Sequence, residues 1–124
     1  MILRNVAAVI LAILVGGAVN FGLIQLGYQI VPPPEGFDPN DLATFKLLQA
    51  RHLVLPFIAH ALGTLVGATI AHVVAGTNKT VFGMLIGAWF LLGGIAMVVM
   101  IGGPAWFVVL DLGVAYIPMA GSAV

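Results

Sequence analysis

The stretch that decides the fold reads His52-Leu-Val-Leu-Pro-Phe-Ile-Ala-His60-Ala-Leu-Gly-Thr-Leu-Val-Gly-Ala-Thr-Ile-Ala-His72-Val-Val-Ala-Gly76. It is almost wholly apolar, and about 20 such residues, at a rise of about 1.5 Å each, are enough to cross the hydrocarbon core of a bilayer. One face repeats a small residue at every fourth position: Ala59, Gly63, Gly67 and Ala71. A second helix can therefore lie close against this one.

Composition extends this interpretation to the whole chain. Of its 124 residues 62% are hydrophobic and only 6% are charged, whereas a soluble domain carries roughly 25% charged residues. We therefore predict an all-α polytopic membrane protein, one bundle over residues 1–124 with the lipid bilayer as its main surroundings. The net charge is zero, which gives no electrostatic reason to expect nucleic acid as a partner. There is no cysteine, so disulfides and thiolate metal sites are excluded.

Upstream of the central stretch, residues 6–31 predict a first transmembrane helix. A signal peptide is the rival interpretation, but this apolar run is longer than the roughly 7–15 residues of a signal peptide's apolar core. Residues 32–51 form a first loop that opens with Pro32-Pro-Pro, which favours an extended backbone. Within this loop we expect a short surface helix over residues 41–50, with Asp41 as its N-cap.

Downstream, the apolar pattern predicts transmembrane helices over residues 52–75, 80–101 and 105–120. The turns between them are short, which makes consecutive helices antiparallel neighbours in a four-helix bundle. Pro118 removes the hydrogen bond to the carbonyl of Val114, so we expect a kink near the end of the fourth helix. The third helix carries its own small positions for helix packing: Gly83, Gly87 and Gly94.

Three polar residues fall at one depth in the predicted bundle. Counted from the first-loop surface, Gln25 lies about 9 Å deep, His60 about 12 Å and Asp111 about 10 Å. Polar groups in hydrocarbon are costly, so each needs a partner or a cavity. The three side chains either form a structural hydrogen-bonded layer, or constitute a proton or ion site, or do not meet.

The histidines also raise the possibility of a haem or pigment. All three lie on one predicted helix, and His60 and His72 are roughly 120° apart around its axis. They cannot share one iron within a single chain, so only ligation through a single histidine such as His60 stays open. We expect His52 and His72 to be interfacial. No phosphate loop, hydrolase or zinc-protease motif is present, so we predict no catalytic residue, no metal site and no enzymatic activity.

Several motifs together suggest a family resemblance. These are Pro-Pro-Pro-Glu-Gly at 32–36, His-Ala-Leu-Gly-Thr-Leu-Val-Gly-Ala at 60–68, Leu-Gly-Gly-Ile-Ala-Met at 92–97, and Trp106-Phe with Leu110-Asp111-Leu and Ala115-Tyr-Ile-Pro-Met-Ala120. In these motifs the chain resembles a family of small bacterial four-helix inner-membrane proteins of unassigned activity. The resemblance implies a bacterial inner-membrane location and transfers no functional residue.

Three functions compete on this basis. The first is a non-enzymatic bundle that assembles into a homo-oligomer or joins other membrane subunits through its small-residue faces. The second is a small proton- or ion-coupled transporter or channel that uses Gln25, His60 and Asp111. The third is a haem- or pigment-binding subunit. Basic residues divide evenly between the two sides, and the acidic, proline-rich first loop favours cytoplasmic termini.

Overall fold

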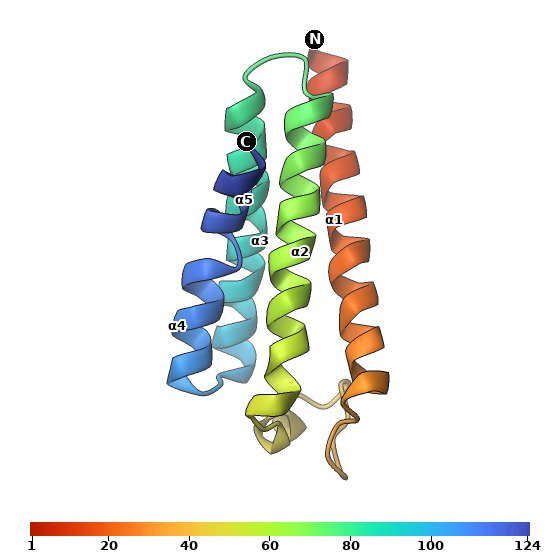
Figure 1. Cartoon of the computed structure of the whole chain (residues 1–124), viewed down its shortest axis with the longest axis vertical. Helices are drawn as coiled ribbons and strands as arrows, with labels where there is room; N and C mark the ends of the chain where they lie inside the picture. The colour runs from red at the N-terminus through yellow and green to blue at the C-terminus, as the bar shows by residue number, and fades with distance from the viewer.

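The computed structural model describes residues 1–124 and is all-helical. Its four segments long and apolar enough to cross a membrane are α1 (Ile2–Ile30), α2 (Ala50–Val74), α3 (Lys79–Ile101), and α4 (Ala105–Val114) continued by α5 (Ile117–Ala123). Figure 1 shows α2 between α1 on one side and α3, α4 and α5 on the other, with successive long helices running in opposite directions. The chain termini lie toward one end, and the first loop lies at the other.

Helices α1 and α2 pack backbone to backbone. A Cβ built on Gly16 would lie 2.8 Å from the carbonyl oxygen of Gly63, and one on Gly67 would lie 3.0 Å from the carbonyl oxygen of Ala12. The first distance is too short for any Cβ, and the second would require the neighbouring backbone to shift. On the same α2 stripe, Ala59 and Ala71 are fully buried. Small residues on both helices therefore let their main chains approach closely.

The glycines of α3 serve a different contact, with the C-terminal part of the chain. Gly83 faces Val124, Gly87 faces Ala120, and Gly94 lies under the ring of Tyr116. A Cβ on Gly94 would lie 2.7 Å from the Tyr116 hydroxyl oxygen. The last span is thus held against the groove that these glycines leave on α3.

The N-terminal helix begins at Ile2, earlier than the predicted start at residue 6, because its polar residues bind the α2–α3 turn. Arg4 Nε donates to the Val74 carbonyl at 2.7 Å, and Asn5 Oδ1 accepts from the Gly76 amide at 2.8 Å. Lys79 Nζ donates to the Val73 carbonyl at 3.1 Å. Two cations therefore occupy the C-terminus of α2, where its free carbonyls and helix dipole favour positive charge.

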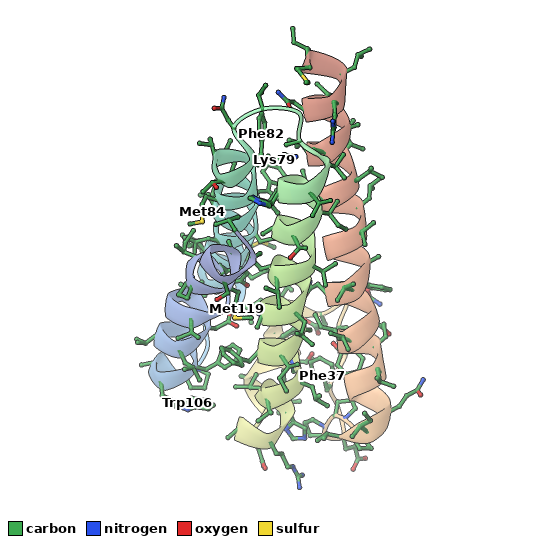
Figure 2. All side chains as sticks on the ribbon, turned by 45° about the horizontal axis from the view of Figure 1, so that its top comes forward. Phe37, Lys79, Phe82, Met84, Trp106 and Met119 are labelled. Atoms are coloured by element: carbon green, nitrogen blue, oxygen red, sulfur yellow. The ribbon has the colours of Figure 1, made fainter.

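The first loop contains a 3₁₀ helix, η1 (Leu42–Leu47), rather than a helix that continues to residue 50. Asp41 caps it, accepting from the Ala43 amide at 3.1 Å. The Thr44 hydroxyl donates to the Asp38 carbonyl at 2.8 Å and closes the turn. Figure 2 shows Phe37 of this loop and Trp106 of α4 toward the end of the bundle that lies opposite Lys79.

The fourth span is broken. Helix α4 ends at Val114, and α5 begins at Ile117 in a changed direction (Figure 1). Pro118 has no N–H to give the Val114 carbonyl, which is the expected effect, but the result is an interruption rather than a kink. The segment also continues to Ala123, beyond the predicted end at residue 120.

Candidate functional site

A cavity of about 480 Å³ lies between the helices in the half of the bundle nearest the first loop. Asn20, Ile24 and Tyr28 of α1 line it on one side, and residues 93–101 of α3 line it on another. Residues from α2, α4, η1 and the α3–α4 turn complete the wall. The volume is within the roughly 300–1,000 Å³ typical of small-molecule sites. Tyr28 and His52 line the cavity near the first loop, and the other polar lining residues lie farther along the helices from that loop: Asn20, His60, Thr64, Asp111 and Tyr116.

His60 and Asp111 meet in this wall. His60 Nδ1 lies 2.8 Å from Asp111 Oδ1. The carboxylate is the more enclosed partner, because the Asp111 side chain is 6% exposed and that of His60 is 22% exposed. When Asp111 is ionised, its carboxylate can only accept, and Nδ1 then carries the proton of this hydrogen bond. That assignment leaves the second ring nitrogen, Nε2, as the atom through which His60 can exchange a proton or bind another group.

Two further side chains hold the pair in place. The Thr64 hydroxyl donates to the His60 carbonyl at 2.8 Å, and the Tyr116 ring stacks on the His60 ring with centroids 5.8 Å apart. The Tyr116 hydroxyl donates to Asp111 Oδ2 over a long 3.5 Å. The sequence analysis did not select Tyr116, because a spacing of five residues from Asp111 does not place two side chains together on a regular helix.

Asn20 is a second residue that the sequence analysis left out of the polar layer. It packs against Gly63, since a Cβ on that glycine would lie 2.9 Å from Asn20 Cβ. Its Oδ1 is buried and has no hydrogen-bond partner. An unpaired buried acceptor is costly, so this amide is the least satisfied polar group at the deep end of the cavity.

Gln25 does not belong to this polar group, which corrects the predicted layer of Gln25, His60 and Asp111. Its side chain is exposed and hydrogen-bonds neither of the other two. The depth estimate did not take account of direction around the helix. Asn20 faces α2, and five further residues turn Gln25 by about 140° away from Asn20. The helix therefore presents Gln25 on its outer side.

His52 is buried at the start of α2, with 8% of its surface exposed. Its Nδ1 accepts from the Gln49 amide at 2.8 Å and so caps the start of α2. It lies between the large cavity and a small one of about 10 Å³, which is close to the space that one water needs. His72 is half-buried near the other end of α2.

No group of three or more His, Asp or Glu side chains converges to form a metal site. Ligation of a haem or pigment through His60 stays a prediction. Comparison with known protein families, with curated proteins and with solved structures finds no match. The cavity and its polar residues are therefore the features of the chain that bear on its function.

Proposed function

We propose that this chain is an integral membrane protein that binds a small, partly apolar molecule in the cavity between its helices. The observation that carries the proposal is the His60–Asp111 pair, 2.8 Å apart, in the wall of a cavity of about 480 Å³. Largely apolar pockets with a few convergent polar groups are the usual form of a small-molecule site. Ionisable residues inside a membrane domain commonly carry protons or contact the transported molecule.

The alternative role for the pair is structural, as a hydrogen bond that joins α2 to α4. That role explains the contact but not its location beside open space. A purely structural pair is better served by complete enclosure, which shields its hydrogen bond from competition. We therefore favour binding, linked to the protonation state of the pair, as in a small proton-coupled carrier.

The membrane setting is part of the same proposal. We place the chain in a bacterial inner membrane as an antiparallel four-span bundle with cytoplasmic termini, and we assign it no enzymatic activity. The length and apolar character of all four segments support the bilayer location. The acidic first loop favours its placement outside.

The proposal is tested with protein in lipid nanodiscs and a panel of three eight-carbon probes: octanol, octylamine and octanoate. The readout is the ¹⁵N signal of the His60 imidazole, with empty nanodiscs as the reference for partitioning. We expect at least one probe to shift this signal saturably. If no probe shifts it, the cavity is not a binding site and the proposal fails.

A pair of glycine substitutions locates the binding. Gly93 lines the cavity, and nothing lies within 4 Å of the place its Cβ would take. Gly93→Leu therefore fills space without a backbone clash, and we expect it to abolish the saturable shift. Gly113→Leu is the matched control, because this helical glycine is equally open but lies outside the cavity. Equal binding by the two variants would count against the cavity.

Assembly into a homo-oligomer stays a second candidate function. It would use a different surface from the small-residue faces that the sequence suggested. The small faces of α1, α2 and α3 named above are filled by contacts within the chain. What is left is the outer side of α1, where Gln25 is exposed with no hydrogen bond inside the chain. Amide side chains can join transmembrane helices. If α1 mediates a homo-oligomer, Gln25→Leu should dissociate it in analytical ultracentrifugation, whereas an unchanged mass would remove this candidate.

A further inference from the structure

The charges that line the cavity are unbalanced. Asp111 is its one acidic residue, and neither lysine nor arginine lines it. The chain's four basic side chains lie elsewhere: Arg4 and Lys79 are engaged at the far end of α2, and Lys46 and Arg51 are exposed at the loop end. A negatively charged ligand would meet the Asp111 carboxylate and would find no lysine or arginine to bind it. A positively charged ligand would meet the Asp111 carboxylate, whose opposite charge stabilises it.

The uncharged part of the lining favours the same guest. Five aromatic side chains border the cavity: Tyr28, Phe45, Phe90, Phe107 and Tyr116. The face of an aromatic ring carries partial negative charge and attracts cations, most strongly where water is excluded. Met97, Val98 and Ile101 add an aliphatic wall. The surroundings thus suit a cation that also carries an apolar group.

One carboxylate oxygen of Asp111 is an acceptor that is only weakly filled. Asp111 Oδ2 has only the long 3.5 Å contact from the Tyr116 hydroxyl. A protonated primary amine supplies three N–H donors together with a positive charge. A quaternary cation would satisfy the charge but would bring no donor for this oxygen.

We propose that the ligand is a lipophilic amine, bound as its ammonium ion beside Asp111, and that its binding releases a proton from His60. This inference rests on the proposed binding function. In the empty site a protonated His60 balances the Asp111 carboxylate, because an uncompensated charge in a membrane interior is costly. When the ammonium ion enters, the same carboxylate balances it, and His60 becomes neutral. One cation is gained and one proton leaves, so the net charge of the site is unchanged.

The other titratable groups that line the cavity do not take over this exchange. They are His52, Tyr28 and Tyr116. His52 Nδ1 accepts from the Gln49 amide and serves as a helix cap. Tyr116 does contact the carboxylate, over a long 3.5 Å, but tyrosines keep their protons near neutral pH. The proton that leaves is therefore assigned to His60, whose Nδ1 makes the short 2.8 Å contact with Asp111.

The same three-probe panel tests the inference by isothermal titration calorimetry in nanodiscs. We expect octylamine to bind about tenfold or more tightly than octanol or octanoate, the lower end of what close opposite charges contribute when desolvated. Repeating the titration in buffers of different ionisation enthalpy counts the protons, and we expect about one released per amine at a pH below the His60 transition. Octanol should release none.

Two variants complete the test. Asp111→Asn should remove the preference for the amine while octanol still binds, and Asp38→Asn, an exposed loop carboxylate, should keep both affinities. If octanol binds wild-type protein as tightly as octylamine does, the proposal of an amine ligand is wrong, but the proposed binding of small molecules in the cavity is retained. Amine binding without proton release would overturn the exchange. If Asp111→Asn does not fold, these two wild-type comparisons still decide the inference.

Discussion

Asp111 and His60 depend on one another because neither has another strong partner. The Asp111 carboxylate is almost fully enclosed, and its short hydrogen bond is the one from His60 Nδ1. Removing one member of such a pair leaves the other buried without a partner, which typically costs more than the pair itself contributes. The energetics of this site therefore concern the pair and not either residue alone.

A double-mutant cycle tests this dependence. We expect His60→Leu to lower the free energy of unfolding by about 3–5 kcal/mol, because the carboxylate is left unpaired in an apolar surrounding. His60→Leu combined with Asp111→Leu should cost less than the sum of the single changes. The measurement is reversible unfolding in mixed micelles as a function of the fraction of SDS. Strict additivity would show that the two residues are not energetically coupled.

Tyr116 provides the milder comparison. Its hydroxyl contact with Asp111 is long, at 3.5 Å, whereas its ring fills space between His60 and Gly94. Tyr116→Phe should therefore cost under about 1 kcal/mol, while Tyr116→Ala should cost about 3–5 kcal/mol for the lost ring. The same unfolding assay checks both. A large loss on Tyr116→Phe would mean that the hydroxyl contributes more than its geometry indicates.

At the scale of the elements, stability depends on where glycines permit backbone contact. Helices α1 and α2 meet at glycines whose Cβ positions are crowded by the facing backbone, whereas Gly17 and Gly22 of α1 have nothing within 4 Å of theirs. The interruption between α4 and α5 also has a local cause, Pro118. Because of this interruption, α4 and α5 run in different directions. Element packing is thus set at a few positions, and the rest of each apolar surface faces outward.

Gly67→Leu tests the α1–α2 contact. A Cβ at this position would lie 3.0 Å from the Ala12 carbonyl oxygen and 3.0 Å from a ring carbon of Phe90. Overpacking of this kind costs roughly 1–3 kcal/mol, so the midpoint of SDS unfolding should fall. Gly17→Leu on α1 is the control, since nothing lies within 4 Å of its Cβ position, and it should leave the midpoint nearly unchanged. Similar effects of both changes would indicate that helix propensity, not contact, dominates.

At the scale of the whole molecule, one half of the bundle is closed and the other contains the cavity. Ala12, Ala71 and Ile86 bring α1, α2 and α3 together near the chain termini. Toward the first loop, α1 and α3 face each other across the cavity instead. The closed half contains the close backbone contacts of Gly67 and Gly83, and the open half carries His60 and Asp111. A bundle with one closed half and one half that contains a cavity suits a binding protein.

Single-cysteine labelling tests the proposed topology. Ser122→Cys and Asn78→Cys should react with an impermeant maleimide from the same side of the membrane, and Asp38→Cys should react only from the opposite side. All three positions are exposed, so access is not limited by burial. Labelling of all three from one side would rule out a four-span arrangement with an external first loop.

The sequence by itself determined that the chain is helical and that four segments can span a membrane, because hydropathy and the length of each run are local properties. It also anticipated an irregularity at Pro118, although as a kink rather than an interruption, together with the cap at Asp41. Depth follows from counting residues along a helix axis. The direction in which a side chain points around that axis depends on how whole helices pack. The same packing decides which residue that side chain meets.

Only the tertiary structure decided which polar residues meet. It placed Gln25 outside and Asn20 inside, brought Tyr116 to the His60 ring, and buried His52 as a helix cap. The physical reason is that residues 12 and 16 on α1 must face Gly63 and Gly67 for the backbones to touch, and this contact sets the rotation of the entire helix. The cavity has the same origin, since it is the space left where α1 and α3 diverge beyond that contact.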